Sequence, residues 1–304
     1  MKLFTSLVVG LTLLGISVTG CQSETIPSDK ILVVSTNTII ADLTETIGGE
    51  AIEHRGILKP GDDPHLYEPV PRDVALIEKA DLIIYNGYNL EPALIRLIEA
   101  TGIQAQKLAV GERVPPLEID EEGNKVPDPH VWGNAANGII MVNAIRDTLI
   151  ALSPENAAEF TANAAQLTAE LEELHEWIKA QIATIPEEQR FLITTHDAFG
   201  YYAQAYDIPV AGTLIGISTE EQPSAQTLQN LVTEIKTLGV KAIFAETTIN
   251  PSLIATVASE AGVKLAPGKL YSDSLGIPGS EADTYIKMLK TNTLTIVEAL
   301  THDN

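Results

Sequence analysis

Segments with strand-like and helix-like patterns alternate along most of this 304-residue chain, in two separate series. The first series has expected strands at residues 31–35, 52–58 and 81–85, an apolar helical face through Ile39, Leu43 and Ile47, and further helices at about 71–80 and 91–100. The second has expected strands at residues 191–195, 209–214, 242–245 and 264–266, and a last helix near 281–300. This rhythm predicts parallel sheets covered by helices. We therefore expect an α/β fold with two similar lobes, each a parallel sheet flanked by helices.

One long helix is expected between the two series. Ser153 can cap this helix, Pro154 suits its first position, and apolar residues recur at helical spacing from Phe160 to Ile182. A coiled-coil arm is the alternative, but the apolar face is only one segment long and lies between two α/β patterns. We predict an N-terminal lobe at residues 30–152, a rigid spine helix at 153–185 and a C-terminal lobe at 186–304, with a cleft between the lobes.

The N-terminus has the pattern of a bacterial lipoprotein signal. A positive charge at Lys2 precedes an apolar stretch over residues 3–18, and small residues then lead to Val18-Thr19-Gly20-Cys21. A membrane-spanning helix is the alternative, but a span needs about 20 apolar residues and this shorter run is interrupted by polar and small ones. We expect a signal peptide at residues 1–20, lipidation at Cys21 and a tether at residues 21–29. Cys21 is the only cysteine, which excludes an internal disulfide and a multi-cysteine metal site.

The charge balance bears on the kind of ligand. Lys and Arg total 19 against 41 Asp and Glu, a formal net charge of −22. A nucleic-acid partner is not expected, because binding to phosphates needs a cationic surface. A cationic ligand suits the negative electrostatic field of this chain better, although an acidic surface also keeps an exported protein in solution.

Three of the six histidines lie where a strand end or loop is expected. These are His65, His130 and His196, whereas the other three lie in an expected strand, in the spine helix and in the C-terminal tail: His54, His175 and His302. In open α/β sheets ligands bind beyond the carboxyl ends of the strands, so loops from two lobes can meet in one cleft. Imidazole nitrogen suits zinc and other first-row cations, and an added carboxylate admits harder cations such as manganese. Asp273 and Glu246 each follow an expected strand, and the residues alone do not choose between them as the fourth ligand.

The motifs together resemble the solute-binding lipoproteins that deliver zinc, manganese or iron to ABC importers, and the resemblance covers nearly the whole mature chain. They are the lipobox, Asp-Pro-His-Leu-Tyr-Glu-Pro around His65, Tyr85-Asn86-Gly87, Asp-Pro-His-Val-Trp around His130, His-Asp-Ala-Phe-Gly-Tyr from His196, Gly216-Ile217-Ser218-Thr219 and Tyr-Ser-Asp-Ser-Leu-Gly around Asp273.

This resemblance carries expectations about the site and the partners. It implies that His65, His130, His196 and Asp273 are the metal ligands and that Glu246 accepts the free N–H of an imidazole. The transported ligand would be Zn²⁺ or Mn²⁺, with Fe²⁺ as a further candidate. The protein would be a lipid-anchored monomer outside the cytoplasm, on the periplasmic side or the cell surface, that delivers its ion to an ABC permease in the cytoplasmic membrane. Limited lobe movement on binding is also implied.

Two departures from the family pattern concern the choice of metal and one turn. The manganese-dedicated branch has glutamate where His196 stands, and many zinc-dedicated members have a long histidine-rich loop where residues 115–129 form a short acidic stretch, which we expect to be a surface loop. A receptor for both metals is consistent with this mixture. Gly133-Asn134-Ala135 stands where the family usually has an aspartate-proline pair, so the sequence does not predict the conformation of the local turn.

Other functions find less support in the sequence. A secreted metallohydrolase also uses histidine-rich zinc sites, but it keeps one position open for water, whereas four protein ligands would close the sphere, and the chain has no His-Glu-x-x-His segment. Neither a Gly-x-Ser-x-Gly elbow nor a phosphate-binding loop is present, so no enzyme activity is expected. A metal-dependent surface adhesin stays a further alternative, which would require an exposed apolar patch.

Overall fold

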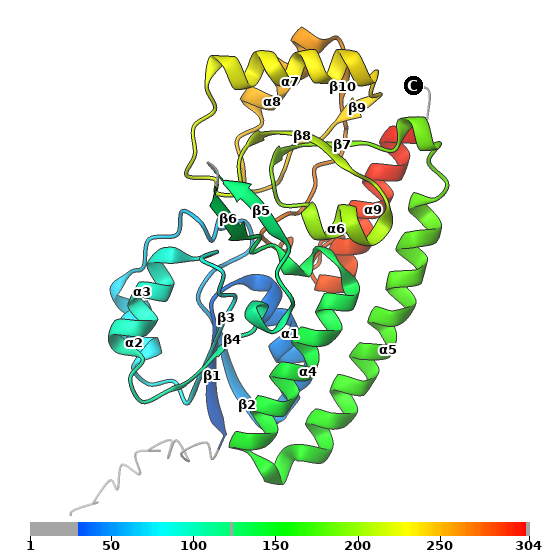
Figure 1. Cartoon of the computed structure of the whole chain (residues 1–304). Coiled ribbons are helices and arrows are strands. Elements are labelled where there is room, and N and C mark those ends of the chain that lie inside the picture. Colours follow the sequence, from blue (N-terminus) through cyan, green and yellow to red (C-terminus); the bar gives the residue numbers. More distant parts are fainter. Residues whose placement is uncertain (1–29, 122–123, 302–304) are drawn as a thin grey trace, which may run out of the picture.

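The computed structural model describes residues 30–121 and 124–301 (Figure 1). The expected signal peptide, the lipidation site Cys21, the tether and His302 lie outside the described residues.

The N-terminal lobe is built on a four-stranded parallel sheet with the order β2–β1–β3–β4. On the central strand β1, Val33 and Val34 point to opposite faces of the sheet and are buried in two different apolar clusters, so helices cover both faces. Strand β4 was not among the expected strands. The elements of this lobe are β1 (Ile31–Ser35), α1 (Thr38–Gly48), β2 (Ile52–Gly56), α2 (Pro71–Ile77), β3 (Leu82–Tyr85), α3 (Pro92–Thr101) and β4 (Gln106–Ala109).

The C-terminal lobe repeats the parallel arrangement in two strand pairs. Strand β7 pairs with β8 and strand β9 with β10, and the Phe244 N–H donates to the Ile193 carbonyl at 2.9 Å, which places the two pairs side by side. The elements are β7 (Leu192–His196), α6 (Gly200–Tyr206), β8 (Val210–Ile215), α7 (Ala225–Leu238), β9 (Ala242–Ile243), α8 (Ser252–Ala261), β10 (Lys264–Leu265) and α9 (Tyr285–Thr301).

Two long helices connect the lobes. Helix α4 (Ala135–Leu152), which was not among the expected helices, packs against α5 (Ala157–Ile182), and Figure 1 shows α5 running along one side of the molecule from the N-terminal lobe to the C-terminal lobe. The 26 residues of α5 span about 39 Å at 1.5 Å per residue. Helix α5 begins at Ala157 and not at the expected Ser153, because Pro154–Asn156 forms a separate 3₁₀ turn and the Ser153 side chain does not cap it. Among the described helices, α4 alone is long and apolar enough to cross a membrane, and its apolar face, which includes Met141 and Ile145, is buried within the protein.

The conformation of residues 118–127 differs from the one expected. The acidic stretch was expected to be a surface loop, but it forms an antiparallel hairpin of β5 (Glu118–Glu121) and β6 (Asn124–Pro127) that lies between the lobes in Figure 1. Ile119 faces Val126 across the pair, and the Leu117 N–H donates to the Tyr201 hydroxyl at 2.8 Å. The cross-strand apolar pair and this anchor explain why a polar stretch is ordered.

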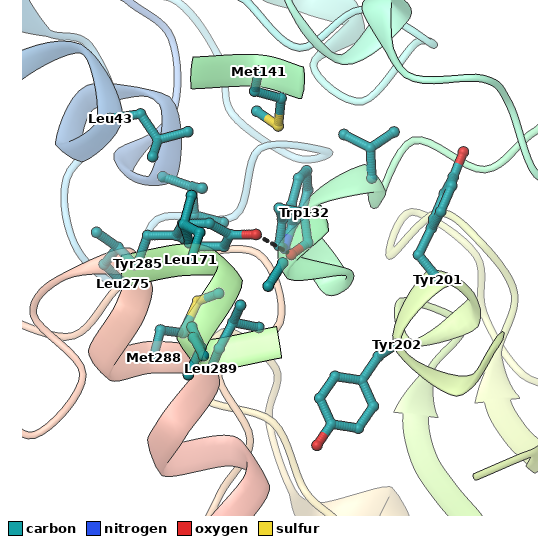
Figure 2. Close-up of a cluster of buried hydrophobic side chains, with 14 of the residues drawn as sticks. Leu43, Trp132, Met141, Leu171, Tyr201, Tyr202, Leu275, Tyr285, Met288 and Leu289 are labelled. Atoms are coloured by element: carbon teal, nitrogen blue, oxygen red, sulfur yellow. Dashed lines mark hydrogen bonds between the residues drawn. The ribbon is translucent and has the colours of Figure 1, made fainter. Parts of the chain in front are cut away.

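A single cluster of buried apolar side chains extends through both lobes. It includes Leu43 of α1, Leu171 of α5, Tyr202 of α6 and Tyr285 of α9. Figure 2 shows part of it around Trp132, whose backbone carbonyl accepts a hydrogen bond from the Tyr285 hydroxyl at 2.6 Å. The lobes therefore share this cluster, in addition to a separate cluster within each lobe.

Candidate metal site

Four buried side chains meet where the two lobes face each other. His65 lies in the loop after β2, His130 directly precedes the short 3₁₀ helix Val131–Gly133, His196 is the last residue of β7, and Asp273 lies in the loop beyond β10. One donor atom from each lies within 4.8 Å of the others, and all four residues are buried. His65, His196 and Asp273 follow strands of the parallel sheets, as the carboxyl-end rule for α/β folds predicts, whereas His130 follows the antiparallel hairpin β5–β6.

The donor atoms face one another. The Nε2 atoms of His65 and His130 are 3.2 Å apart, Nε2 of His196 lies 3.2 Å from one carboxylate oxygen of Asp273, and Nε2 of His130 lies 3.4 Å from the other. Among the described residues, neither Asp273 oxygen nor Nε2 of His196 has a geometrically satisfactory hydrogen-bond partner. Buried polar atoms are normally paired, so this cluster suits a cation that would bind all of them.

Hydrogen bonds on the far side of two rings fix their orientation. Nδ1 of His130 lies 2.9 Å from a carboxylate oxygen of Asp128, and Nδ1 of His196 lies 2.5 Å from Oε2 of Glu246. A carboxylate at Nδ1 favours the tautomer whose Nε2 lone pair points to the centre. Glu246 also accepts the backbone N–H of His196, so the structure places Glu246 behind that ring and not among the four converging donors.

Both Asp-Pro-His segments form the same local turn. The His65 N–H donates to Asp63 and the His130 N–H to Asp128, each at 2.9 Å. An aspartate two residues before a histidine can close such a turn through its side chain, which fixes the backbone from which the ring projects. These aspartates were not expected to have a role, although the repeated Asp-Pro-His segment was the available signal.

A buried network of hydrogen bonds stabilises the segment that carries His130. The Asn86 side chain donates to the Pro129 carbonyl at 2.9 Å, and Glu91 accepts the Asn86 N–H and the Thr36 hydroxyl, both at 2.8 Å. Burial raises the pKa of Glu91 to about 7. The sequence offered no signal for Glu91, because its partners are 5 and 55 residues away along the chain.

Burial and the two nearby carboxylates set the protonation of the site. Burial lowers the pKa of His65 to about 3, against the opposing charge of Asp273. Burial would also lower the pKa of His196, but Glu246 and Asp273 outweigh it and raise that pKa well above its ordinary value. Burial alone would raise the pKa of Asp273, but His196, His130 and His65 hold it well below its usual range. Without a metal ion, a proton on His196 balances part of the carboxylate charge.

A cavity of about 470 Å³ reaches the site from the surface. It is lined by Tyr85 and Tyr88 of the N-terminal lobe and by Ile217 and Ser218 of the C-terminal lobe, and it touches His65. Three carboxylate side chains, Glu99, Glu112 and Glu220, also line it. This cavity gives a small cation a route to donors that are otherwise covered.

At the turn around Asn134, whose conformation the sequence did not predict, Asn134 caps a helix. The Asn134 side chain accepts the Ala136 N–H at 2.9 Å at the start of α4. Asparagine is a strong N-cap residue, so it starts this helix without the aspartate-proline pair that is usual in the family.

Comparisons with known proteins identify a family for this chain. The family model described as the periplasmic zinc-uptake complex component A, ZnuA, matches residues 33–299. The manganese-binding lipoprotein MntA of Halalkalibacterium halodurans is 35% identical over 285 residues, which cover 92% of this chain and 93% of that protein. The manganese ABC transporter substrate-binding lipoprotein PsaA of Streptococcus pneumoniae is 34% identical over 309 residues, which cover 98% of this chain and 99% of that protein.

Solved structures show the same fold. The periplasmic zinc-binding protein TroA of Treponema pallidum superposes with a TM-score of 0.85 at 33% identity, covering 90% of this chain and all of that one. A manganese-bound single-site mutant of a periplasmic metal-binding protein of Candidatus Liberibacter asiaticus superposes with a TM-score of 0.82 at 27% identity, covering 89% of this chain and all of that one.

Proposed function

We infer that this chain, which belongs to the ZnuA family of metal-uptake components, is the extracytoplasmic substrate-binding lipoprotein of an ABC importer and binds one divalent transition metal ion, zinc or manganese. One observation carries this proposal: three imidazole nitrogens and one carboxylate converge in a buried cluster, and several of these donor atoms have no hydrogen-bond partner within the part of the chain that the structure describes.

The donor set supports zinc and manganese as cargo. Three imidazoles and a carboxylate can complete a tetrahedral shell around Zn²⁺. If Asp273 binds through both oxygens the shell expands, and larger shells with oxygen donors suit Mn²⁺. The relatives named above for zinc and for manganese support both metals.

The same donor set argues against hydrolysis. A catalytic zinc site keeps a position for water, whereas four protein donors would fill the tetrahedral shell here. The ion is then a cargo that must be bound and released, not a resident catalyst.

The lipid anchor and the permease partner are parts of the proposal that rest on the lipobox and on the relatives named as lipoproteins of ABC transporters. Cys21→Ser should move the protein from the membrane fraction to the soluble extracytoplasmic fraction, because acyl chains at this residue would be its attachment. Retention of the variant in the membrane fraction would exclude this form of anchoring.

Calorimetric titration of metal-stripped protein with Zn²⁺ tests the proposed function. We expect one ion per chain and a rise in melting temperature, because a ligand that binds only the folded state stabilises it. His130→Gln should bind zinc much more weakly, whereas His175→Gln, on α5 outside the cluster, should bind like the wild type. Failure of the wild type to bind, or equal losses in both variants, would reject the proposal.

A further inference from the structure

A hydrogen bond across the lobes lies directly beside one of the four converging donors. The Thr219 hydroxyl of the C-terminal lobe donates to Oδ2 of Asp63 in the N-terminal lobe at 2.8 Å. The other oxygen of the same carboxylate, Oδ1, accepts the backbone N–H of His65 at 2.9 Å. Thr219 is only 7% exposed. Asp63 therefore connects Thr219 to the backbone from which the His65 ring projects.

The loop that carries Thr219 is joined to the strand that carries His196. Thr219 lies in the segment after β8, and the Gly216 carbonyl in this segment accepts the Asp197 N–H at 3.1 Å. Asp197 directly follows His196, the last residue of β7. Because β7 and β8 are also paired, Thr219 and His196 are connected through one structural unit.

Asp273 is held differently, although it also follows a strand of the C-terminal lobe. The Trp132 indole N–H donates to the Ser272 carbonyl and the Gly61 N–H to the Ser274 hydroxyl, each at 2.8 Å, and Leu275 N–H donates to the Thr38 hydroxyl at 2.9 Å. Residues on both sides of Asp273 are thus bound to the N-terminal lobe. The segment that carries Asp273 is also bound to the C-terminal lobe, because Leu270 pairs with Glu246. Asp273 is therefore held by both lobes, whereas His65 and His130 belong to the N-terminal lobe and His196 belongs to the unit that carries Thr219.

Two connections therefore link the same two units side by side. One would be the ion, which His65 and His130 bind from the N-terminal lobe and His196 from the C-terminal lobe, and the second is the Thr219–Asp63 hydrogen bond. His196 cannot move away from the ion while Thr219 stays bonded to Asp63, because both belong to one unit. The neighbours of Thr219, Ile217 and Ser218, line the cavity that reaches His65, so this bond lies beside the route by which an ion would leave.

We propose that Thr219 and Asp63 are positioning residues that retain the bound ion, holding His65 and His196 at coordination distance and so setting the rate of metal release. This inference rests on the proposed metal-binding function. A hydroxyl donating to a half-buried carboxylate makes a charge-assisted hydrogen bond, so its loss should be visible in the rate of dissociation.

Thr219→Val tests the proposal, because valine keeps the shape of threonine and removes its hydroxyl. Zinc dissociation is measured by stopped flow, mixing zinc-loaded protein with an excess of a fluorescent zinc chelator. We expect dissociation about 10-fold faster or more, with the association rate within about twofold of the wild type, because the bond acts after the ion has arrived. Thr219→Ser, which keeps the hydroxyl, should restore slow release. Thr256→Val, at an exposed threonine on α8, is the control for the substitution itself.

A double-mutant cycle separates this contact from a general loosening of the loop. In an Asp63→Asn background, Thr219→Val should increase the zinc dissociation rate by less than about a further twofold, since the hydrogen bond between the two side chains is already altered. An unchanged release rate in Thr219→Val, no rescue by Thr219→Ser, or a full additional effect in the Asp63→Asn background would overturn the inference. Failure of the wild type to bind zinc would instead reject the proposed function, so the two failures are distinguishable.

Discussion

His196 lies between two carboxylates, and this placement decides how protons compete with the metal. Glu246 and Asp273 raise its pKa well above the ordinary value, whereas the pKa of His65 is lowered to about 3. At neutral pH, His65 is therefore ready to bind an ion, and His196 must first lose a proton. Metal affinity should therefore fall as the pH falls. The decline should begin above pH 6.5, which is about the ordinary pKa of histidine.

Proton release on zinc binding checks this assignment. We expect about one proton to leave per ion bound at pH 7, because His196 exchanges its proton for the metal. Calorimetric titrations in two buffers with different ionisation enthalpies measure the number. A binding enthalpy independent of the buffer would mean that His196 is neutral in the metal-free protein and would contradict the account.

Asp273 is the donor whose removal should distinguish the two metals. In the wild type, zinc should bind more tightly than manganese, following the general order for nitrogen and oxygen sites. Asp273→Ala should weaken manganese binding more than zinc binding, because zinc can keep three imidazoles and complete a tetrahedron with water.

Competition titrations of the two metals measure this difference. Asp147→Ala, at an exposed aspartate on α4, serves as the control for loss of a carboxylate. Equal losses for both ions in Asp273→Ala, or manganese outcompeting zinc in the wild type, would show that Asp273 does not set selectivity.

At the scale of elements, periodicity predicted most of the β-α-β succession but not every member. The expected strand at residues 31–35 coincides with β1 because four of its five residues are apolar. Strand β4 was missed because Gln106-Lys107 breaks the apolar pattern and only the pairing with β3 makes it a strand. The β5–β6 hairpin was missed for a similar reason: its order depends on Ile119, Val126 and a contact with Tyr201 in the other lobe, which composition does not reveal.

Helix α9 offers a matched test of the shared core. Leu289 is 1% exposed and packs in the cluster of Figure 2, whereas Leu294 on the same helix is 52% exposed. Leu289→Ala should lower the free energy of unfolding by about 2–5 kcal/mol, since it leaves a cavity in the core. Leu294→Ala should change it by less than about 0.5 kcal/mol. Chemical denaturation of both variants measures the difference, and similar effects at the two positions would contradict the packing described for α9.

At the scale of the whole molecule, topology made the convergence of His65, His196 and Asp273 foreseeable, whereas His130 follows the hairpin that was not expected. Loops after parallel strands meet at one edge of each sheet, so histidines in such loops of two facing lobes are brought together. Their role as ligands stays a prediction. The contacts that orient them could not be predicted in the same way, because Glu246 is 50 residues from His196 and Thr219 is 156 residues from Asp63. Such pairs depend on how the lobes face each other.

The shared core also limits how far the lobes can move. Buried side chains from α1, α5, α6 and α9 form one continuous cluster, and a wide opening would expose it to water. Small-angle scattering curves of the metal-free and zinc-loaded protein should therefore nearly superimpose. A large decrease in the radius of gyration on zinc binding would indicate a hinge that this packing does not allow.

Anomalous diffraction from crystals of the zinc-loaded protein, recorded on both sides of the zinc absorption edge, tests the central claim most directly. The account predicts one anomalous peak per chain, with the imidazole nitrogens of His65, His130 and His196 at about 2.0–2.1 Å and the Asp273 carboxylate completing the shell. A peak outside this cluster, or a zinc ion that leaves any of the four side chains unbound, would contradict it.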